Sequence, residues 1–219
     1  MQPIPDIQSN HARLTALRHE IHRHPELAFE EQRTADHVAA WLSRLGIEVH
    51  RGLAVTGVVG VLRVGNSARA IGLRADMDAL PIQEQNPYPH RSVHDGKMHA
   101  CGHDGHTTML LGAARVLAEN PDFAGTVHFI FQPAEEGRGG AKAMIADRLF
   151  ERFPCDSIFG MHNRPHLAVG HFAVRGGPMM AGGAFFDVDI TGVGAHGARP
   201  EAGVDPVIVA VQIASTLQT

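Results

Sequence analysis

Apolar positions at the start of the chain follow the period of an α-helix. We predict one helix that Asp6 caps and that ends at His24, because Pro25 cannot continue it. A second helical pattern covers residues 30–45, and Gly46 is its expected C-terminal stop. The apolar face of the first helix is formed by Ile7, Leu14, Leu17 and Ile21.

Strand and helix patterns then alternate along the chain. The predicted strands cover residues 57–64, 70–74, 126–131 and 157–161, and the predicted helices cover residues 107–119 and 141–149. Alternation of this kind indicates an α/β fold in which helices flank a mostly parallel sheet.

The last part of the chain carries a different pattern. A strand-like run at 169–174 precedes the glycine-rich turn RGGPMMAGG at 175–183, which is the best candidate for a domain boundary. A strand at 184–191 and a helix at 204–217, led by Asp205 and Pro206, follow it. One strand and one helix bury little surface on each other, so we expect this second domain to be incomplete.

Composition limits the classes of protein that fit. A chain of 219 residues with 44% hydrophobic content can bury one core and part of another. The net charge of −4, with both signs interspersed, predicts no nucleic-acid partner. No signal-like start and no apolar run near the roughly 20 residues of a membrane span occur, so we predict no membrane partner and a cytoplasmic location. The two cysteines, Cys101 and Cys155, are too few for a disulfide framework.

Polar residues follow three of the predicted strands. Asp76 and Asp78 come after the second strand, Glu135 and Glu136 after the third, and His162 after the fourth. Ligands of open α/β sheets bind beyond the carboxyl ends of the strands, so we expect these side chains to share a site. The simpler alternative is that strand ends are polar because they meet solvent.

The segment MHACGHDGHT adds sulfur and nitrogen donors. Cys101 and His103 precede the helix predicted from Thr107, where free backbone N–H groups should lower the pKa of the thiol. A lone cysteine is more often a small buried apolar residue, and we read Cys155 that way. The other histidines that we assign to the surface or to ordinary partly buried positions are His11, His19, His22, His37, His50 and His128.

Adjacent carboxylates at Glu135 and Glu136 suit metal-assisted hydrolysis. One of them can bind a metal while the other accepts a proton from water. Sulfur, nitrogen and oxygen donors together admit Zn, Mn, Co or Ni, so the sequence does not select the metal.

Several segments resemble the signature blocks of the hippurate hydrolase and N-acyl-amino-acid amidohydrolase family, which includes auxin-conjugate hydrolases and is related to aminoacylase and carboxypeptidase metalloenzymes. The resemblance extends over nearly the whole chain and implies a zinc-peptidase-like catalytic domain, of which 1–180 is the N-terminal part, and the beginning of a smaller α+β lid and dimerisation domain at 181–219. The matching blocks are RHEIHRHPELAFEE, GLRADMDALPI, MHACGHDGHTTMLLGAA, FQPAEEGRGGA, GMHNRP and GVGAHGARPEAGVDPV.

The resemblance implies a site with two divalent metal ions. Its metal ligands would be Cys101, His103, Glu136 and His162, with Glu135 as general base and acid. The family's last ligand is a histidine near the C-terminus of a longer chain, so we expect this chain to be C-terminally truncated.

The resemblance also assigns residues around the ligands. Asp76 and Asp78 would orient the ligands, as groups outside the coordination shell do. His196 resembles a histidine that reaches the partner subunit's site in a homodimer and stabilises the oxyanion, an effect of about 3 to 4 kcal/mol for such donors.

Three readings of function follow. The first is an amidohydrolase whose small-molecule substrates are N-acyl amino acids, with an aromatic acyl group favoured. The second is an inactive metal-binding fragment that lacks its C-terminal ligand and most of its lid. The third, an aminopeptidase or carbamoylase relative, fits the cysteine-containing block less well.

Overall fold

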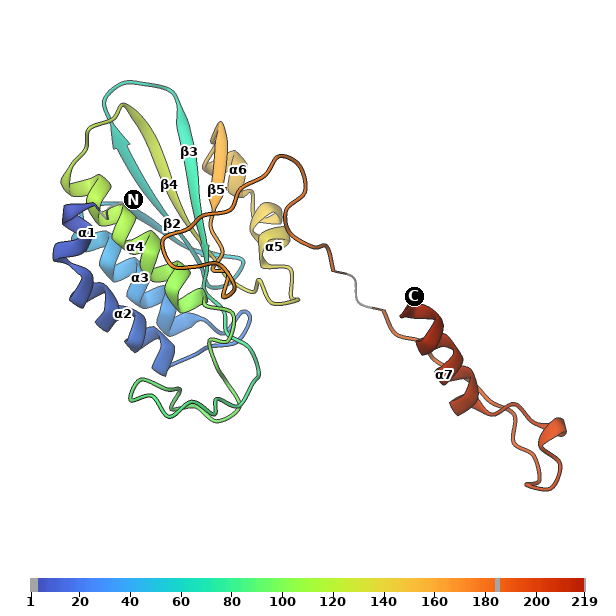
Figure 1. The fold of residues 1–219 in the computed structure, drawn as a ribbon. Coiled ribbons are helices and arrows are strands. Elements are labelled where there is room, and N and C mark those ends of the chain that lie inside the picture. The colour runs from blue at the N-terminus through green and yellow to red at the C-terminus, as the bar shows by residue number, and fades with distance from the viewer. Residues whose placement is uncertain (1–3, 184–185, 219) are drawn as a thin grey trace. The chain divides into compact units, whose positions relative to one another are not determined.

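The computed structural model of the protein describes residues 4–183 and 186–218 (Figure 1). It divides into two compact units, Met1–Gly170 and His171–Thr219, which are described separately. The first unit contains α1 (Pro5–Ser9), α2 (His11–Arg23), α3 (Gln32–Arg44), β1 (Glu48–Leu53), β2 (Gly57–Val64), β3 (Ala70–Asp76), α4 (His103–Glu119), β4 (Gly125–Gln132), α5 (Gly140–Ala146), α6 (Leu149–Arg152) and β5 (Ser157–Gly160).

The five strands form one sheet in the order β1-β2-β4-β3-β5. Strand β3 runs parallel to β4 and to β5, whereas β2 is antiparallel to both β1 and β4. The α/β class with flanking helices is confirmed, but the sheet is mixed rather than mostly parallel. The reason is β2, which runs opposite to both of its neighbours, β1 and β4. Strand β1, which pairs with β2 as a hairpin, was not predicted, because an exposed edge strand carries no strong apolar pattern.

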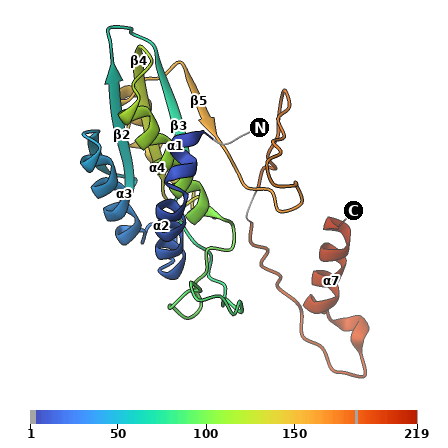
Figure 2. The same ribbon diagram turned by 60° about the vertical axis from the view of Figure 1, so that its left-hand side comes forward.

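Helices cover both faces of the sheet (Figure 1; Figure 2). Neighbouring residues of β2 point to opposite faces, so Val58 joins the core beneath α3 and α4, while Val59 joins the core beneath α5 and α6. Strand β4 is buried along its whole length between these two layers. The centre of the sheet is therefore packed on both faces, whereas β5 at its edge is exposed along its whole length.

Helix boundaries differ from the predicted ones at three places. The first predicted helix is two helices, α1 and α2, which break at Asn10, and Asp6 lies inside α1 with no capping hydrogen bond. Helix α4 begins at His103, earlier than predicted, because Gly102 adopts a left-handed conformation with φ of 86° and starts the helix there. The short helix predicted at 141–149 is likewise two helices, α5 and α6.

The second unit contains the 3-10 helix η1 (Pro200–Ala202) and α7 (Pro206–Leu217). Helix α7 begins at Pro206, two residues after the predicted bound at 204 and directly after Asp205, which caps it by accepting a hydrogen bond from the Val207 N–H at 2.9 Å.

Two predicted strands in the last part of the chain are wrong. No strand occurs at 169–174 or at 186–191, the described part of the segment predicted at 184–191, and residues 184–185 lie outside the described residues. A strand needs a hydrogen-bonded neighbour, and across this part of the described chain the single bridge joins Val193 and Val204. The domain boundary at 180/181 stays a prediction. Within the described ranges, no helix is both long and apolar enough to cross a membrane.

Candidate metal centre

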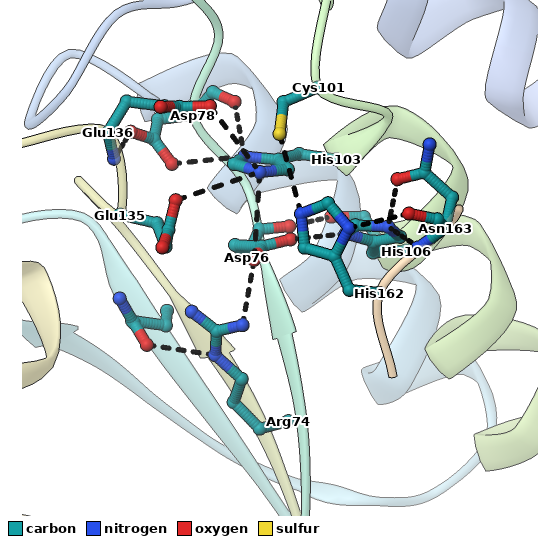
Figure 3. Close-up of polar contacts among 12 residues, drawn as sticks. Arg74, Asp76, Asp78, Cys101, His103, His106, Glu135, Glu136, His162 and Asn163 are labelled. Carbon is teal, nitrogen blue, oxygen red and sulfur yellow. Dashed lines mark hydrogen bonds and ion pairs between the residues drawn. The ribbon is translucent and has the colours of Figure 1, made fainter. Parts of the chain in front are cut away.

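The candidate centre lies where the parallel strands β3, β4 and β5 end (Figure 3). Asp76 is the last residue of β3, Glu135 and Glu136 follow β4, and His162 follows β5. Strand β3 lies between the other two, so the carboxyl ends of all three meet at one edge. The sheet topology therefore brings these strand ends together, and their use as one site stays a prediction.

His103 is the central donor of the cluster. Its side chain is fully buried at the first position of α4, and its Nδ1 lies 2.8 Å from the carbonyl oxygen of Asp78. A carbonyl oxygen only accepts, so Nδ1 carries a proton. Burial acts to lower the pKa of His103, but the carboxylates of Asp78, Asp76 and Glu136 raise it, so Nε2 is the nitrogen whose proton a metal would replace. Nε2 lies 3.8 Å from Glu136 Oε1 and 3.9 Å from Glu135 Oε2. An oriented imidazole of this kind is prepared for metal binding.

Donor atoms gather around His103 in three overlapping groups, each with its donor atoms within 4.8 Å of one another. One group contains Cys101 and His162, and a second contains Glu135 and Glu136. The third group joins His103 to Asp76 and His106. The structure thus brings together all four predicted ligands and the predicted general base. Their individual roles stay predictions.

Two buried atoms of the centre test whether a cation fits. Glu136 Oε1 and His103 Nε2 are buried and have no hydrogen-bond partner among the described residues. Burying such acceptors without a partner costs stability, so nearly all buried polar atoms in proteins are paired. A cation that faces both acceptors would satisfy them, and the donor set therefore fits a divalent metal.

The charge around Cys101 corrects one expectation. Its Sγ lies 3.4 Å from His162 Nε2. Burial, followed by the nearby carboxylates of Glu136 and Glu135, raises the pKa of this thiol to about 12. The predicted lowering of the pKa by the helix N-terminus is wrong, because desolvation and negative charge outweigh the helix dipole. Without a cation the thiol keeps its proton.

Asp76 is held as an anion beneath the cluster. Burial acts to raise its pKa, but the hydrogen bond from His106 and the charges of His103 and Arg74 hold the pKa well below its usual range. One Asp76 oxygen lies 2.6 Å from His106 Nδ1, and the other accepts a 2.7 Å bond from Arg74. Both partners lie outside the predicted ligand set, so the orienting role of Asp76 stays a prediction.

His106 and Asn163 were not predicted as site residues. His106 is buried between Asp76 and Asn163, and its Nε2 lies 2.8 Å from Asn163 Oδ1. This contact ties the residue next to His162 to the end of β3. A signal was present in the sequence, because His103 and His106 are three residues apart and therefore share one face of α4.

His22 was assigned to an ordinary position, but it is buried in a polar network below the centre. Its Nδ1 lies 3.0 Å from Asp104 Oδ2, and its Nε2 lies 3.1 Å from Glu84 Oε1. Arg18 donates to the same Asp104 oxygen at 2.9 Å. The network ties α2 to the first turn of α4, next to His103.

His196 lies in the second unit, on the exposed segment that precedes η1. Its Nδ1 accepts a 3.1 Å hydrogen bond from the Ala198 N–H.

The fold and the site define an α/β protein with a candidate metal centre at the carboxyl ends of its parallel strands. The chain belongs to peptidase family M20/M25/M40, which it matches over residues 72–217.

Individual relatives agree with this membership. The chain is 48% identical to a hippurate hydrolase of Campylobacter jejuni over all of its own length and 57% of the relative's. It is 46% identical to the IAA-amino acid hydrolase ILR1-like 4 of Arabidopsis thaliana, over 94% of its own length and 46% of the relative's. The chain therefore spans about half the length of the curated relatives it matches.

A solved structure agrees as well. The Bacillus subtilis YXEP protein, described as a dinuclear metal binding peptidase from the M20 family, superposes with a TM-score of 0.74 at 42% identity, over 78% of this chain and 48% of that one.

Proposed function

We propose that the protein is a metal-dependent amidohydrolase that cleaves N-acyl amino acids, hippurate-like ones among them, into a carboxylic acid and a free amino acid. The observation that carries the proposal is the convergence of Cys101, His103, Glu136 and His162 beside Glu135 at one edge of the sheet. The names of the related hippurate hydrolase and IAA-amino acid hydrolase support this substrate class.

Two divalent metal ions would complete the centre, as the description of the YXEP protein suggests. Cys101, His103, Glu136 and His162 would hold them, and Mn, Zn, Co or Ni suits these donors. When bound, such ions polarise a carbonyl oxygen and lower the pKa of water.

Glu135 is suited to move the proton. Its side chain is 40% exposed, so it faces solvent while lying 3.9 Å from His103 Nε2. The carboxylate would accept a proton from the attacking water as the new C–O bond forms. It would then transfer that proton to the amide nitrogen as the C–N bond breaks, so the acid and the free amine are both released. Removing this carboxylate should therefore stop turnover without removing a ligand.

Further parts of the proposal concern the whole protein. A homodimer in which His196 stabilises the oxyanion of the partner subunit's substrate fits the family resemblance. A cytoplasmic location fits the two free thiols at Cys101 and Cys155.

A second candidate is metal binding without turnover. It is favoured by the donor atoms gathered around His103 and by the two buried atoms there that lack a partner among the described residues, which by themselves support metal uptake and not turnover. The two candidates differ in one result, because both predict metal uptake and only the first predicts release of a free amino acid.

The test is hydrolysis of hippurate and a panel of N-acyl amino acids by the purified chain with Mn²⁺, Zn²⁺ or Co²⁺. Glu135→Gln is expected to lower kcat at least about a hundredfold, whereas the exposed Glu151→Gln on α6 should change nothing. Turnover that survives in Glu135→Gln would exclude Glu135 as the base. Metal uptake without turnover by the purified chain would favour the second candidate.

A further inference from the structure

A buried glutamate from the N-terminal part of the chain contacts the turn that carries the two adjacent carboxylates. Glu31 is fully buried at the start of α3 and makes no capping hydrogen bond to that helix. Instead, its Oε1 accepts a 2.8 Å hydrogen bond from the Ala134 N–H, 103 positions away. Its Oε2 accepts a 2.5 Å bond from the Thr56 hydroxyl.

The contacted turn has a strained backbone. Ala134 adopts a φ of 52°, a left-handed conformation that a residue with a Cβ rarely adopts, and it directly precedes Glu135. Such a conformation costs about 1 kcal/mol or more and persists only where surrounding contacts hold it. Because Ala134 lies between the end of β4 and Glu135, its conformation contributes to the direction in which Glu135 and Glu136 leave the strand.

Other contacts hold the same turn. The Gly140 N–H donates to the Ala134 carbonyl at 2.8 Å, and the Glu136 N–H donates to Asp78 Oδ2 at 2.9 Å. A Cβ at Gly140 would lie 1.7 Å from the Pro133 carbonyl oxygen, so this position tolerates only glycine. Of these contacts, Glu31 supplies the one to the N–H of the strained residue itself.

The chemistry of a buried carboxyl indicates what Glu31 contributes. An apolar side chain would fill the same space without the cost of burying a polar group. What an apolar residue lacks is an acceptor for the Ala134 N–H, which would then be buried without a partner.

We propose that Glu31 is a positioning residue whose carboxyl fixes the left-handed backbone at Ala134 and thereby aims Glu135 and Glu136 at the buried His103. The part that concerns Glu135 rests on the proposed function. The part that concerns Glu136 requires only that the centre binds metal.

Glu31→Gln is the conservative variant. Burial raises the pKa of Glu31, and either protonation state of the carboxyl offers an acceptor to Ala134. The glutamine amide keeps that acceptor, and its NH₂ group can donate to the Thr56 hydroxyl. We therefore expect Glu31→Gln to bind Mn²⁺ and Zn²⁺ as the wild type does.

The test compares this variant with two that lack the contact, with Mn²⁺ and Zn²⁺ affinities measured by calorimetry on the full chain. Glu31→Met, which keeps the volume but not the acceptor, should weaken binding about 10- to 100-fold, the range for groups that orient ligands. Glu31→Asp keeps the carboxyl on a side chain that is one methylene shorter, so it should also weaken metal binding. This variant replaces Glu31→Met in the test if Glu31→Met does not fold.

A matched control separates positioning from stability. Thr56→Val removes the other hydrogen bond of Glu31 and should lower the unfolding free energy while leaving metal affinity unchanged. Adding Ala134→Gly to Glu31→Met should restore part of the lost affinity, because glycine adopts a positive φ without strain.

Three results would overturn the proposal: unchanged affinity in folded Glu31→Met and Glu31→Asp, an equal loss in Thr56→Val, or no metal uptake by the wild type. Absence of metal uptake by the wild type would also contradict the proposed metal centre. A wild type that binds metal but hydrolyses no substrate contradicts the proposed function and the part of the proposal that concerns Glu135, whereas the affinities of the variants still decide the part that concerns Glu136.

Discussion

At the scale of the residue, the centre contains more carboxylate groups than positively charged side chains. Asp76, Glu135 and Glu136 lie around His103, and Arg74 is the arginine that contacts this group, through Asp76. Negative charge and burial together keep the Cys101 thiol protonated. Binding of a metal must therefore expel the thiol proton.

This proton gives metal affinity a dependence on pH. The pKa of the Cys101 thiol, about 12, lies above the usual working range, so one proton is released by this group throughout that range. We expect the apparent affinity for Zn²⁺ to rise by about tenfold per pH unit between pH 7 and 9 from this group alone. Calorimetry over that range should show the slope, and Cys101→Ala should reduce it by about one proton. An unchanged slope in Cys101→Ala would show that Cys101 is not a ligand.

The buried His22 gives stability a dependence on pH in the metal-free chain. The hydrogen bond to Asp104, opposed by burial and assisted by Glu84, raises the pKa of His22 above its ordinary value of 6.5. The stabilisation is therefore fully present below about pH 6.5 and is lost as pH rises through the raised value in the folded chain. The other rings beside His22 are those of His90 and His99.

Urea unfolding tests the role of His22. His22→Ala is expected to lower the unfolding free energy by about 1.5 to 3 kcal/mol near pH 6, the range for hydrogen bonds to charged groups, and by less at pH 8.5. His11→Ala, an exposed histidine at the start of α2, should change little at either pH. A loss in His22→Ala that grows with pH would contradict the assigned charge state.

At the scale of the element, α4 connects the core to the site. Its first residue is His103, and its buried face packs on the sheet and on α2 and α3 through Leu110, Leu111 and Ala114. The Trp41 ring of α3 donates to the Leu111 carbonyl at 3.2 Å. The helix therefore fixes His103 relative to the strand ends by packing far from the ligands.

A cavity in this packing should cost stability. Leu111 is fully buried, and Leu111→Ala is expected to lower the unfolding free energy by about 2 to 5 kcal/mol. Met109 lies on the opposite side of α4 and is 42% exposed, so Met109→Ala should cost less than about 0.5 kcal/mol. Equal losses in the two variants, measured by urea unfolding, would show that α4 is not packed as described.

At the scale of the whole molecule, the candidate ligands all belong to the first unit, Met1–Gly170. The exposed segment that follows it contains Phe172, 72% exposed, and Val174, 92% exposed, with no strand among its residues. Exposed backbone without ladder hydrogen bonds is a preferred site of proteolysis.

Limited trypsin digestion tests whether the ligands all lie in the first unit. Beyond Arg152 the chain has three arginines, and Arg164 and Arg199 precede prolines that block trypsin, so the expected cut in this part of the chain is after Arg175. The resulting N-terminal fragment is expected to retain the metal affinity of the intact chain. Loss of that affinity on cutting would mean that residues after Arg175 supply a ligand.

Sequence by itself determined the α/β class, β2, the caps at Gly46 and Asp205, and the polar residues beyond the strands, because these features depend on local period and turn chemistry. It also identified the donor types of the candidate centre. It did not predict β1, whose formation depends on pairing with β2, or the break at Asn10.

Only the tertiary structure decided the positions, hydrogen-bond partners and protonation of the donors. The carboxyl that holds Ala134 is 103 positions away in sequence, and His106 becomes part of the site only where α4 meets β3 and Asn163. The raised pKa of Cys101 likewise results from burial beside Glu135 and Glu136. Contacts between distant segments, burial and local charge density arise when the layers pack, and no window of sequence contains them.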